Sequence, residues 1–182
     1  DFDKAKLIVR EMTDLLALDL VDKGLVTDQI VLTIGYDIEN LTDPARREAY
    51  SGPITTDRYG RKVPKNAHGS INLSRQTSST RMMLDAVTEL YERIVDKNLL
   101  VRRMYVVANH VIPERLVRKE RVQQQMDLFT DYEAREKEIE RENKALEREK
   151  RQQKAVIAIR KKYGKNAILK GMNFEEGATA IE

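Results

Sequence analysis

Apolar and polar residues follow two different periods in the first part of the chain. Across residues 3–23, apolar side chains recur at steps of three and four, and Gly24 follows the last of them. This spacing predicts an amphipathic helix that ends at a glycine. Residues 29–37 instead alternate, which predicts a strand with one buried face. The side chains expected on that face are Ile30, Leu32, Ile34 and Tyr36.

A long polar segment separates this strand from the next. Residues 38–64 are rich in turn-forming residues, so we expect an irregular connection, often functional at this length, with a short hairpin around Tyr59-Gly60. Residues 67–76 alternate again, which predicts a second strand. Ile71 and Leu73 lie on its apolar face. Its other face is polar and uncharged, which suits contact with a hydrated partner, and it holds His68, Ser70, Asn72 and Ser74.

A second helix and a third strand complete the predicted core. The hydroxyl residues 77–80 can cap a helix that we expect to run to about Lys97. Residues 99–109 favour a strand. The order of elements predicts an α+β fold over residues 1–115, in which two helices cover one face of a small, mostly antiparallel sheet.

The last third of the chain has a different character. From about Asp131 to Tyr163 it is polar, with oppositely charged pairs four residues apart such as Glu140 and Lys144. We expect a linker over residues 116–130 and a tail over 131–182 that contains one long charged helix. Apolar residues at heptad spacing are too few for a strong coiled coil, so this helix should extend from the core or lie across a partner.

Charge is spread unevenly along the 182 residues. The segment from Arg58 to Arg81 holds six basic residues and no acid, and the segment from Lys150 to Lys170 holds eight and none. The first 57 residues hold twelve acids and six bases, so the net charge of +3 hides this asymmetry. Clustered positive charge indicates a polyanionic partner, most often nucleic acid, although an unevenly charged solvated surface explains it equally well.

Composition excludes several kinds of chemistry. The chain has no cysteine, which excludes disulfide bonds, thiolate zinc sites and cysteine nucleophiles and fits a reducing cytoplasm. No apolar run approaches the roughly 20 residues that a membrane span needs. His68 and His110 stand outside any metal-binding motif, and phosphate-loop, nucleophile-elbow and zinc-protease motifs are absent. We therefore expect no catalytic residues, no metal and no cofactor in this chain.

The residues point to a binding surface instead. The helix start at 77–80 offers unpaired N–H groups and hydroxyls to a phosphate, with Arg75 and Arg81 beside it. A plain helix cap with two surface arginines is the simpler alternative. On the last strand, Arg102 and Arg103 should point to opposite sides, one to an edge and the other to the sheet face beside Ser70 and Asn72.

The predicted binding face has no aromatic residue for stacking bases, because the strand at 67–76 contains none. It should therefore follow the backbone of a duplex rather than stack single-stranded bases.

A short motif lies in the linker. The residues Gln125, Met126, Asp127, Leu128 and Phe129 resemble the Gln-x-Asp/Ser-Leu-Phe peptide with which bacterial DNA-handling enzymes bind the sliding clamp. Leu128 and Phe129 can fill an apolar pocket while Gln125 forms hydrogen bonds at its rim. Alternatively, Leu128 and Phe129 anchor the tail helix to the core.

Three stretches resemble the C-terminal part of Y-family translesion DNA polymerases, of the UmuC-like type in Gram-positive bacteria. They are VPKNAHGSINLSRQTSSTRMMLDAV, VRRMYVVAN and AIRKKYGKNAILKGMNFEEGAT. The resemblance covers roughly residues 1–125 as a little-finger domain and the rest as the C-terminal tail. It implies a part in DNA-damage bypass during the SOS response, with primer–template duplex DNA and the sliding clamp as partners.

The resemblance also implies which parts are absent. The palm, which would carry nucleotidyl transfer and Mg²⁺, is missing, so this fragment should be inactive alone. A chain that starts at Asp1 without methionine looks like a cut from a longer protein. Little fingers usually have four strands, so the first is expected to be missing, which would leave a sheet edge open to dimer formation, with the tail helix as another route. The residues expected to contact DNA are Lys62, Lys65, His68, Ser70, Asn72, Arg75, Thr77, Ser78, Ser79, Thr80, Arg81, Arg102 and Arg103.

Two other functions remain open from the sequence. A structural adaptor would assemble through its long helix, indifferent to salt. An RNA-binding α+β domain would prefer RNA, which the lack of stacking aromatics disfavours.

Overall fold

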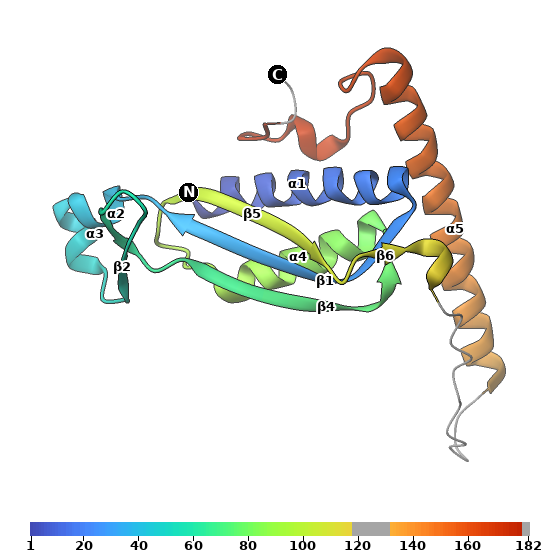
Figure 1. The fold of residues 1–182 in the computed structure, drawn as a ribbon, viewed down its shortest axis with the longest axis horizontal. Helices are drawn as coiled ribbons and strands as arrows, with labels where there is room; N and C mark the ends of the chain where they lie inside the picture. The colour runs from blue at the N-terminus through green and yellow to red at the C-terminus, as the bar shows by residue number, and fades with distance from the viewer. Residues whose placement is uncertain (118–131, 180–182) are drawn as a thin grey trace.

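One antiparallel sheet with helices on one face forms the centre of the molecule (Figure 1). The computed structural model describes residues 1–117 and 132–179. The elements are α1 (Phe2–Lys23), β1 (Leu25–Tyr36), α2 (Glu39–Thr42), α3 (Pro44–Ala49), β2 (Ile54–Thr56), β3 (Lys62–Pro64), β4 (Ala67–Thr77), α4 (Thr80–Ile94), β5 (Val101–Asn109), β6 (Ile112–Pro113), η1 (Glu114–Leu116), α5 (Tyr132–Tyr163) and η2 (Gly171–Phe174). The α+β fold predicted from the sequence is confirmed.

The sheet has the order β4-β1-β5, and both pairings are antiparallel. The short strand β6 pairs with the first residues of β1, so β1 begins at Leu25, four residues earlier than predicted. An irregularity between Thr27 and Gln29 interrupts the alternation there, which is why the pattern became readable only from residue 29. In the described residues β4 and β5 form the edges of the main path, and dimer formation through an edge stays a prediction.

The predicted inner face of β1 packs against both α1 and α4. Ile30, Leu32 and Ile34 have no exposed surface, and α4 contributes equally buried residues from its apolar stripe. Gly69 of β4 lies opposite Leu32, and a Cβ there would stand 3.2 Å from side-chain carbons of Leu90 and Ile94. The missing side chain therefore lets α4 approach the sheet closely. α4 ends at Ile94 rather than near Lys97.

Helix α1 is buried on two sides, by the sheet and by the C-terminal segment that runs along it (Figure 1). Glu11 is 3% exposed and accepts hydrogen bonds from the Asn173 side chain and the Thr179 N–H, both at 2.8 Å. Asp14, also buried, forms an ion pair with Lys170. Leu15, one of the apolar residues at helical spacing in residues 3–23, is 52% exposed. The spacing of apolar residues could not reveal this second buried side, because the buried residues there, Glu11 and Asp14, are polar.

The segment over residues 38–64 is more ordered than predicted. The hairpin around Tyr59-Gly60 is confirmed as β2 and β3, and the helices α2 and α3 precede it. The buried side chain of Asn40 explains how α2 is held. Its amide donates to the backbone oxygens of Asp37 and Leu100, and its oxygen accepts from the Leu100 N–H at 2.9 Å.

The long charged helix is confirmed as α5, which runs past one end of the sheet (Figure 1). It ends just before Gly164, whose φ of 99° suits a left-handed cap. Its later half packs on α1, and Gln153 is buried. The helix therefore lies across this chain's own domain.

Candidate nucleic-acid interface

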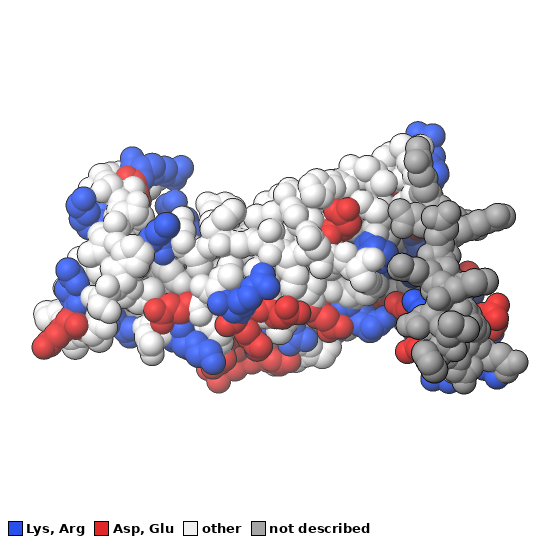
Figure 2. Space-filling view, turned by 90° about the horizontal axis from the view of Figure 1, so that it is seen from below, with Lys and Arg blue, Asp and Glu red and all other residues white. Residues whose placement is uncertain are grey.

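The face of the sheet away from the helices is open. His68, Ser70, Asn72 and Ser74 are exposed along β4, as the alternation predicted. Seen from below, the upper part of the middle of the molecule is almost free of charged side chains, whereas a band rich in Asp and Glu runs along its lower edge (Figure 2). Lys and Arg gather near the end that holds α2, α3 and the hairpin. The open face is thus mostly uncharged, with cations gathered at one end and acidic residues along one side.

Hydrogen bonds across the strands fix the polar side chains of this face. Gln29 on β1 donates to the Asn72 side chain at 2.9 Å and accepts from the Asn109 side chain at 2.9 Å. Thr33 is bonded to the His68 ring at 2.8 Å. Because these hydrogen bonds already restrain the side chains in the free protein, binding a ligand would cost little further side-chain entropy.

Tyr105 of β5 lies on the same open face and was missed by the sequence argument. It stands opposite Thr33, in the row of His68, and is 55% exposed; Val107 beside it is 47% exposed. The prediction of a face without aromatic residues is therefore wrong. It considered only the strand at 67–76, whereas the alternation of residues 99–109 carried the missing signal.

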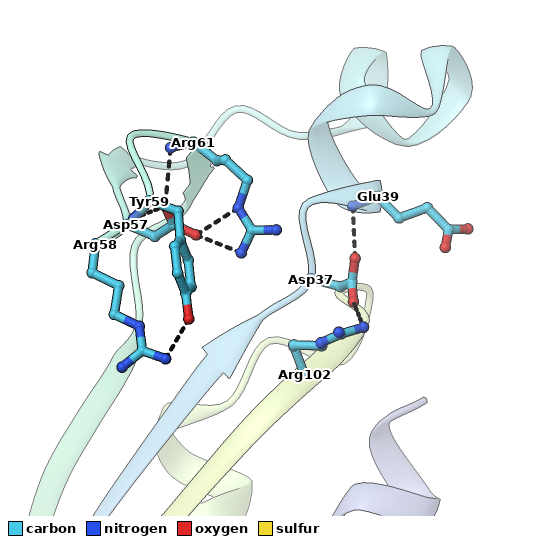
Figure 3. Close-up of polar contacts among 7 residues, drawn as sticks. All are labelled: Asp37, Glu39, Asp57, Arg58, Tyr59, Arg61 and Arg102. Carbon is cyan, nitrogen blue, oxygen red and sulfur yellow. Dashed lines mark hydrogen bonds and ion pairs between the residues drawn. The ribbon is translucent and has the colours of Figure 1, made fainter.

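The two neighbouring arginines of β5 are separated by an irregularity in its pairing. Gly35 pairs with Arg103 and Tyr36 pairs with Val101, so Arg102 is the extra residue. Arg103 is exposed and pairs with Gly35, whereas Ser70 pairs with Val31, four residues earlier on β1. Arg103 therefore does not lie beside Ser70 and Asn72, as the sequence had predicted. Arg102 forms an ion pair with Asp37 at 3.3 Å at the end of the strand (Figure 3).

The other predicted cations occupy different places. Lys62 and Lys65 are exposed at the hairpin end of the sheet, the end that also holds Arg103. Arg75 is exposed far along β4 and donates to the Asn143 side chain at 3.4 Å. Arg81 lines a cleft between α1, α4 and α5, away from the open face. The predicted set is therefore not one patch.

The predicted phosphate site at the start of α4 is filled by the chain itself. Ser79 caps α4 and donates to one oxygen of Glu149 at 2.6 Å, and the Arg81 N–H donates to the other at 2.9 Å. Gln153 donates to the Ser78 carbonyl and the Thr80 hydroxyl, both at 2.9 Å. The four hydroxyl residues, Thr77, Ser78, Ser79 and Thr80, are buried.

This corrects the expectation that the helix start lies open to DNA. Chemically, the anion that the unpaired N–H groups favour is present, but it is a carboxylate from α5. No local signal distinguishes Glu149 from the many other glutamates of that helix. A role of these hydroxyls in DNA contact stays a prediction.

Replacing Glu149 with alanine is expected to lower the free energy of unfolding by about 1 to 2 kcal/mol, because the start of α4 loses two hydrogen bonds to a charged acceptor. Urea unfolding would measure the change. Glu147→Ala is the matched control, since Glu147 is exposed on the same helix. Equal stability of the two variants would contradict a stabilising contact between Glu149 and α4.

The described residues offer no metal centre and no membrane-spanning helix. They contain no group of three His, Cys, Asp or Glu residues placed to hold a metal ion. Within the same residues, no helix is long and apolar enough to cross a bilayer. The clamp-binding peptide at residues 125–129 lies outside the described residues.

Comparison with known proteins identifies the family. The model of the impB/mucB/samB family C-terminal domain matches residues 1–128. The chain therefore belongs to this family, the C-terminal domain of UmuC-like Y-family translesion DNA polymerases. No curated protein matches the chain. The resemblance to the C-terminal domain of UmuC-like Y-family polymerases is confirmed over residues 1–128.

Proposed function

We propose that this chain is the DNA-binding and clamp-tethering C-terminal region of a translesion polymerase that acts in the bacterial cytoplasm. The observation that carries the proposal is the open sheet face, held rigid by cross-strand hydrogen bonds and bordered by cations, in a member of this polymerase family. β1 has 12 residues and so spans about 40 Å, a little more than one turn of duplex DNA.

The proposed role of the face is orientation of the primer–template duplex. Arg103 and Arg75 contact phosphates, while the hydroxyl and amide groups between them bind phosphate or sugar oxygens. Tyr105 and Val107 add apolar contact, most simply with sugars. Contacts of this kind position a protein on DNA without reading its sequence, as a polymerase that must accept any template requires. Nucleotidyl transfer belongs to the parent enzyme's palm, so this fragment is proposed to be non-catalytic.

The proposed role of residues 125–129 is tethering. A peptide that binds the sliding clamp raises the local concentration of the DNA-binding face at the primer end. Two weak contacts together allow brief and reversible access, whereas either alone would dissociate quickly. This part of the proposal rests on the sequence motif.

Binding of a primer–template duplex is expected to weaken steeply with salt. With about four phosphate contacts, from Arg75, Arg103 and the cations of the hairpin end, the slope of log affinity against log salt is about −3.6, roughly a 150-fold loss between 50 and 200 mM. Fluorescence anisotropy would measure this, with duplex RNA and single-stranded RNA as parallel ligands. Affinity that does not change with salt would contradict the proposal. A preference for RNA would favour the RNA-binding alternative, for which the exposed Tyr105 could stack on a base.

A further inference from the structure

The tip of the β2–β3 hairpin is a tightly organised turn (Figure 3). One carboxylate oxygen of Asp57 accepts the backbone N–H groups of Tyr59 and Arg61, both at 2.9 Å. The other accepts the Arg61 guanidinium at 2.7 Å. Gly60 provides the positive φ of 79° that the turn requires. The hydrogen bond from Arg61 holds the pKa of the Asp57 carboxyl below its usual range, so this carboxylate stays ionised at neutral pH.

The exposed ring of Tyr59 holds two guanidinium groups. The guanidinium carbons of Arg58 and Arg61 lie 4.7 and 5.1 Å from the ring centroid, and Arg58 also donates to the Tyr59 hydroxyl. In Figure 3 the two groups lie on either side of the ring. A ring flanked in this way is poorly placed to stack on a base. It instead restrains cations that would otherwise be mobile.

The tip carries an excess of positive charge. Arg58, Arg61 and Lys62 stand against the single carboxylate of Asp57. Arg61 is paired with Asp57, whereas Arg58 has no carboxylate within ion-pair distance among the residues that the structure describes. Lys62 donates to the Thr56 hydroxyl and is exposed. Arg58 and Lys62 therefore remain available to an anion.

The hairpin stands at the opposite end of β4 from Arg75. The ten residues from Lys65 to Arg75 span at most about 33 Å, because the pairing of β4 with β1 is irregular between Asn72 and Thr77. Phosphates one helical turn apart on a DNA strand are separated by about 34 to 36 Å. Between these two ends, the open face along β4 is uncharged. Two cationic ends at this spacing match the repeat of a B-form duplex, and a single nucleotide or a short anion could contact only one of them.

We propose that the β2–β3 hairpin is a second DNA contact, in which Arg58 and Lys62 bind duplex phosphates about one helical turn from those bound at Arg75. The proposal rests on the function proposed for the sheet face, and it adds phosphate contacts on the hairpin, beyond the end of the sheet that holds Arg103. Tyr59 is a positioning residue here, because it acts by holding Arg58.

The test is the double variant Arg58→Ala/Lys62→Ala on DNA duplexes of two lengths. On a 20-base-pair duplex, the salt slope is expected to fall by about 1.8, at 0.9 for each phosphate contact, with an affinity loss of about tenfold or more. A duplex of about 8 base pairs is only about 27 Å long and cannot reach both ends, so there the loss should be at most about twofold. Anisotropy titrations would give both quantities.

A matched control, Lys23→Ala/Lys97→Ala, makes the same change in net charge by removing two exposed lysines, one at the end of α1 and the other in the turn after α4. It should bind both duplexes within about twofold of the wild type. If the wild type fails to bind the long duplex, the proposed function is wrong. If the wild type binds with a steep salt slope but the hairpin variant matches it on the long duplex, only the second contact is wrong. A thermal midpoint equal to that of the wild type would show that the variant is folded.

Discussion

Replacing Arg75, Arg103 and Tyr105 together with alanine is expected to lower affinity for duplex DNA by about 100-fold or more. Each arginine is assigned one phosphate contact, and a charge-assisted contact of this kind contributes roughly tenfold. The salt slope should fall by about 1.8, since two contacts are lost. Loss of Tyr105 removes apolar area, which lowers affinity at every salt concentration. Anisotropy against a primer–template duplex at several salt concentrations would separate the two effects.

Arg81→Ala is an informative control for that variant. The sequence placed Arg81 at the phosphate site, whereas the structure places it beside α5, where its backbone N–H donates to Glu149. We expect its replacement to change duplex affinity by no more than about twofold. If Arg81→Ala weakened binding more than the open-face variant, the interface would lie at the start of α4 and not on the sheet. DNA would then have to displace the Glu149 carboxylate.

The elements of the domain could be predicted because each buries one face in a regular period. Alternation placed Leu32 inward and His68 outward, and both placements hold. Pairings between residues distant in the sequence could not be predicted in the same way. The start of β1 depends on β6, and the side chain of Asn40 acts through Leu100, 60 residues further along. Neither contact produces a repeating pattern of apolar and polar residues in the nearby sequence.

The candidate site was predictable to the same extent. The polar face of β4 followed from alternation, and the same reasoning applied to β5 would have found Tyr105. The place of Arg103 could not be found, because an extra residue at Arg102 shifts the register. The sequence also could not predict that Glu149 covers the start of α4, because this contact depends on where α5 packs. The sequence showed that α5 is a charged helix but held no marker of the face that Glu149 and Gln153 occupy.

The described contacts of the tail with the domain are largely polar. Ion pairs and hydrogen bonds link Lys161 to Asp22, Lys170 to Asp14 and Glu149 to the start of α4. The pair of Lys161 and Asp22 is exposed, so it contributes little and weakens with salt, and the interface depends on its buried members, among them Asp14 and Gln153. The clamp peptide precedes α5 in the chain. We propose that it acts as a tether whose binding to the clamp does not depend on how α5 packs on the domain.

Replacing Leu128 and Phe129 with alanine is expected to abolish binding to a bacterial sliding clamp. Apolar anchors in a partner's pocket commonly contribute about 2 kcal/mol or more each, so losing both should weaken binding by about 1,000-fold. A fluorescent peptide of residues 121–132 should bind with micromolar affinity, and the double-alanine peptide should not bind measurably. Gln123→Ala/Gln124→Ala, just outside the motif, should bind as the original peptide does.

The same pair of alanines in the full chain separates the tether from the anchor alternative. If Leu128 and Phe129 serve the clamp, duplex affinity and the thermal midpoint should both stay close to those of the wild type. If they anchor the tail to the core, burial of two large apolar side chains is lost, and the midpoint should fall by several degrees. A peptide that fails to bind, together with a destabilised full chain, would remove clamp tethering and leave DNA binding as a separate proposal.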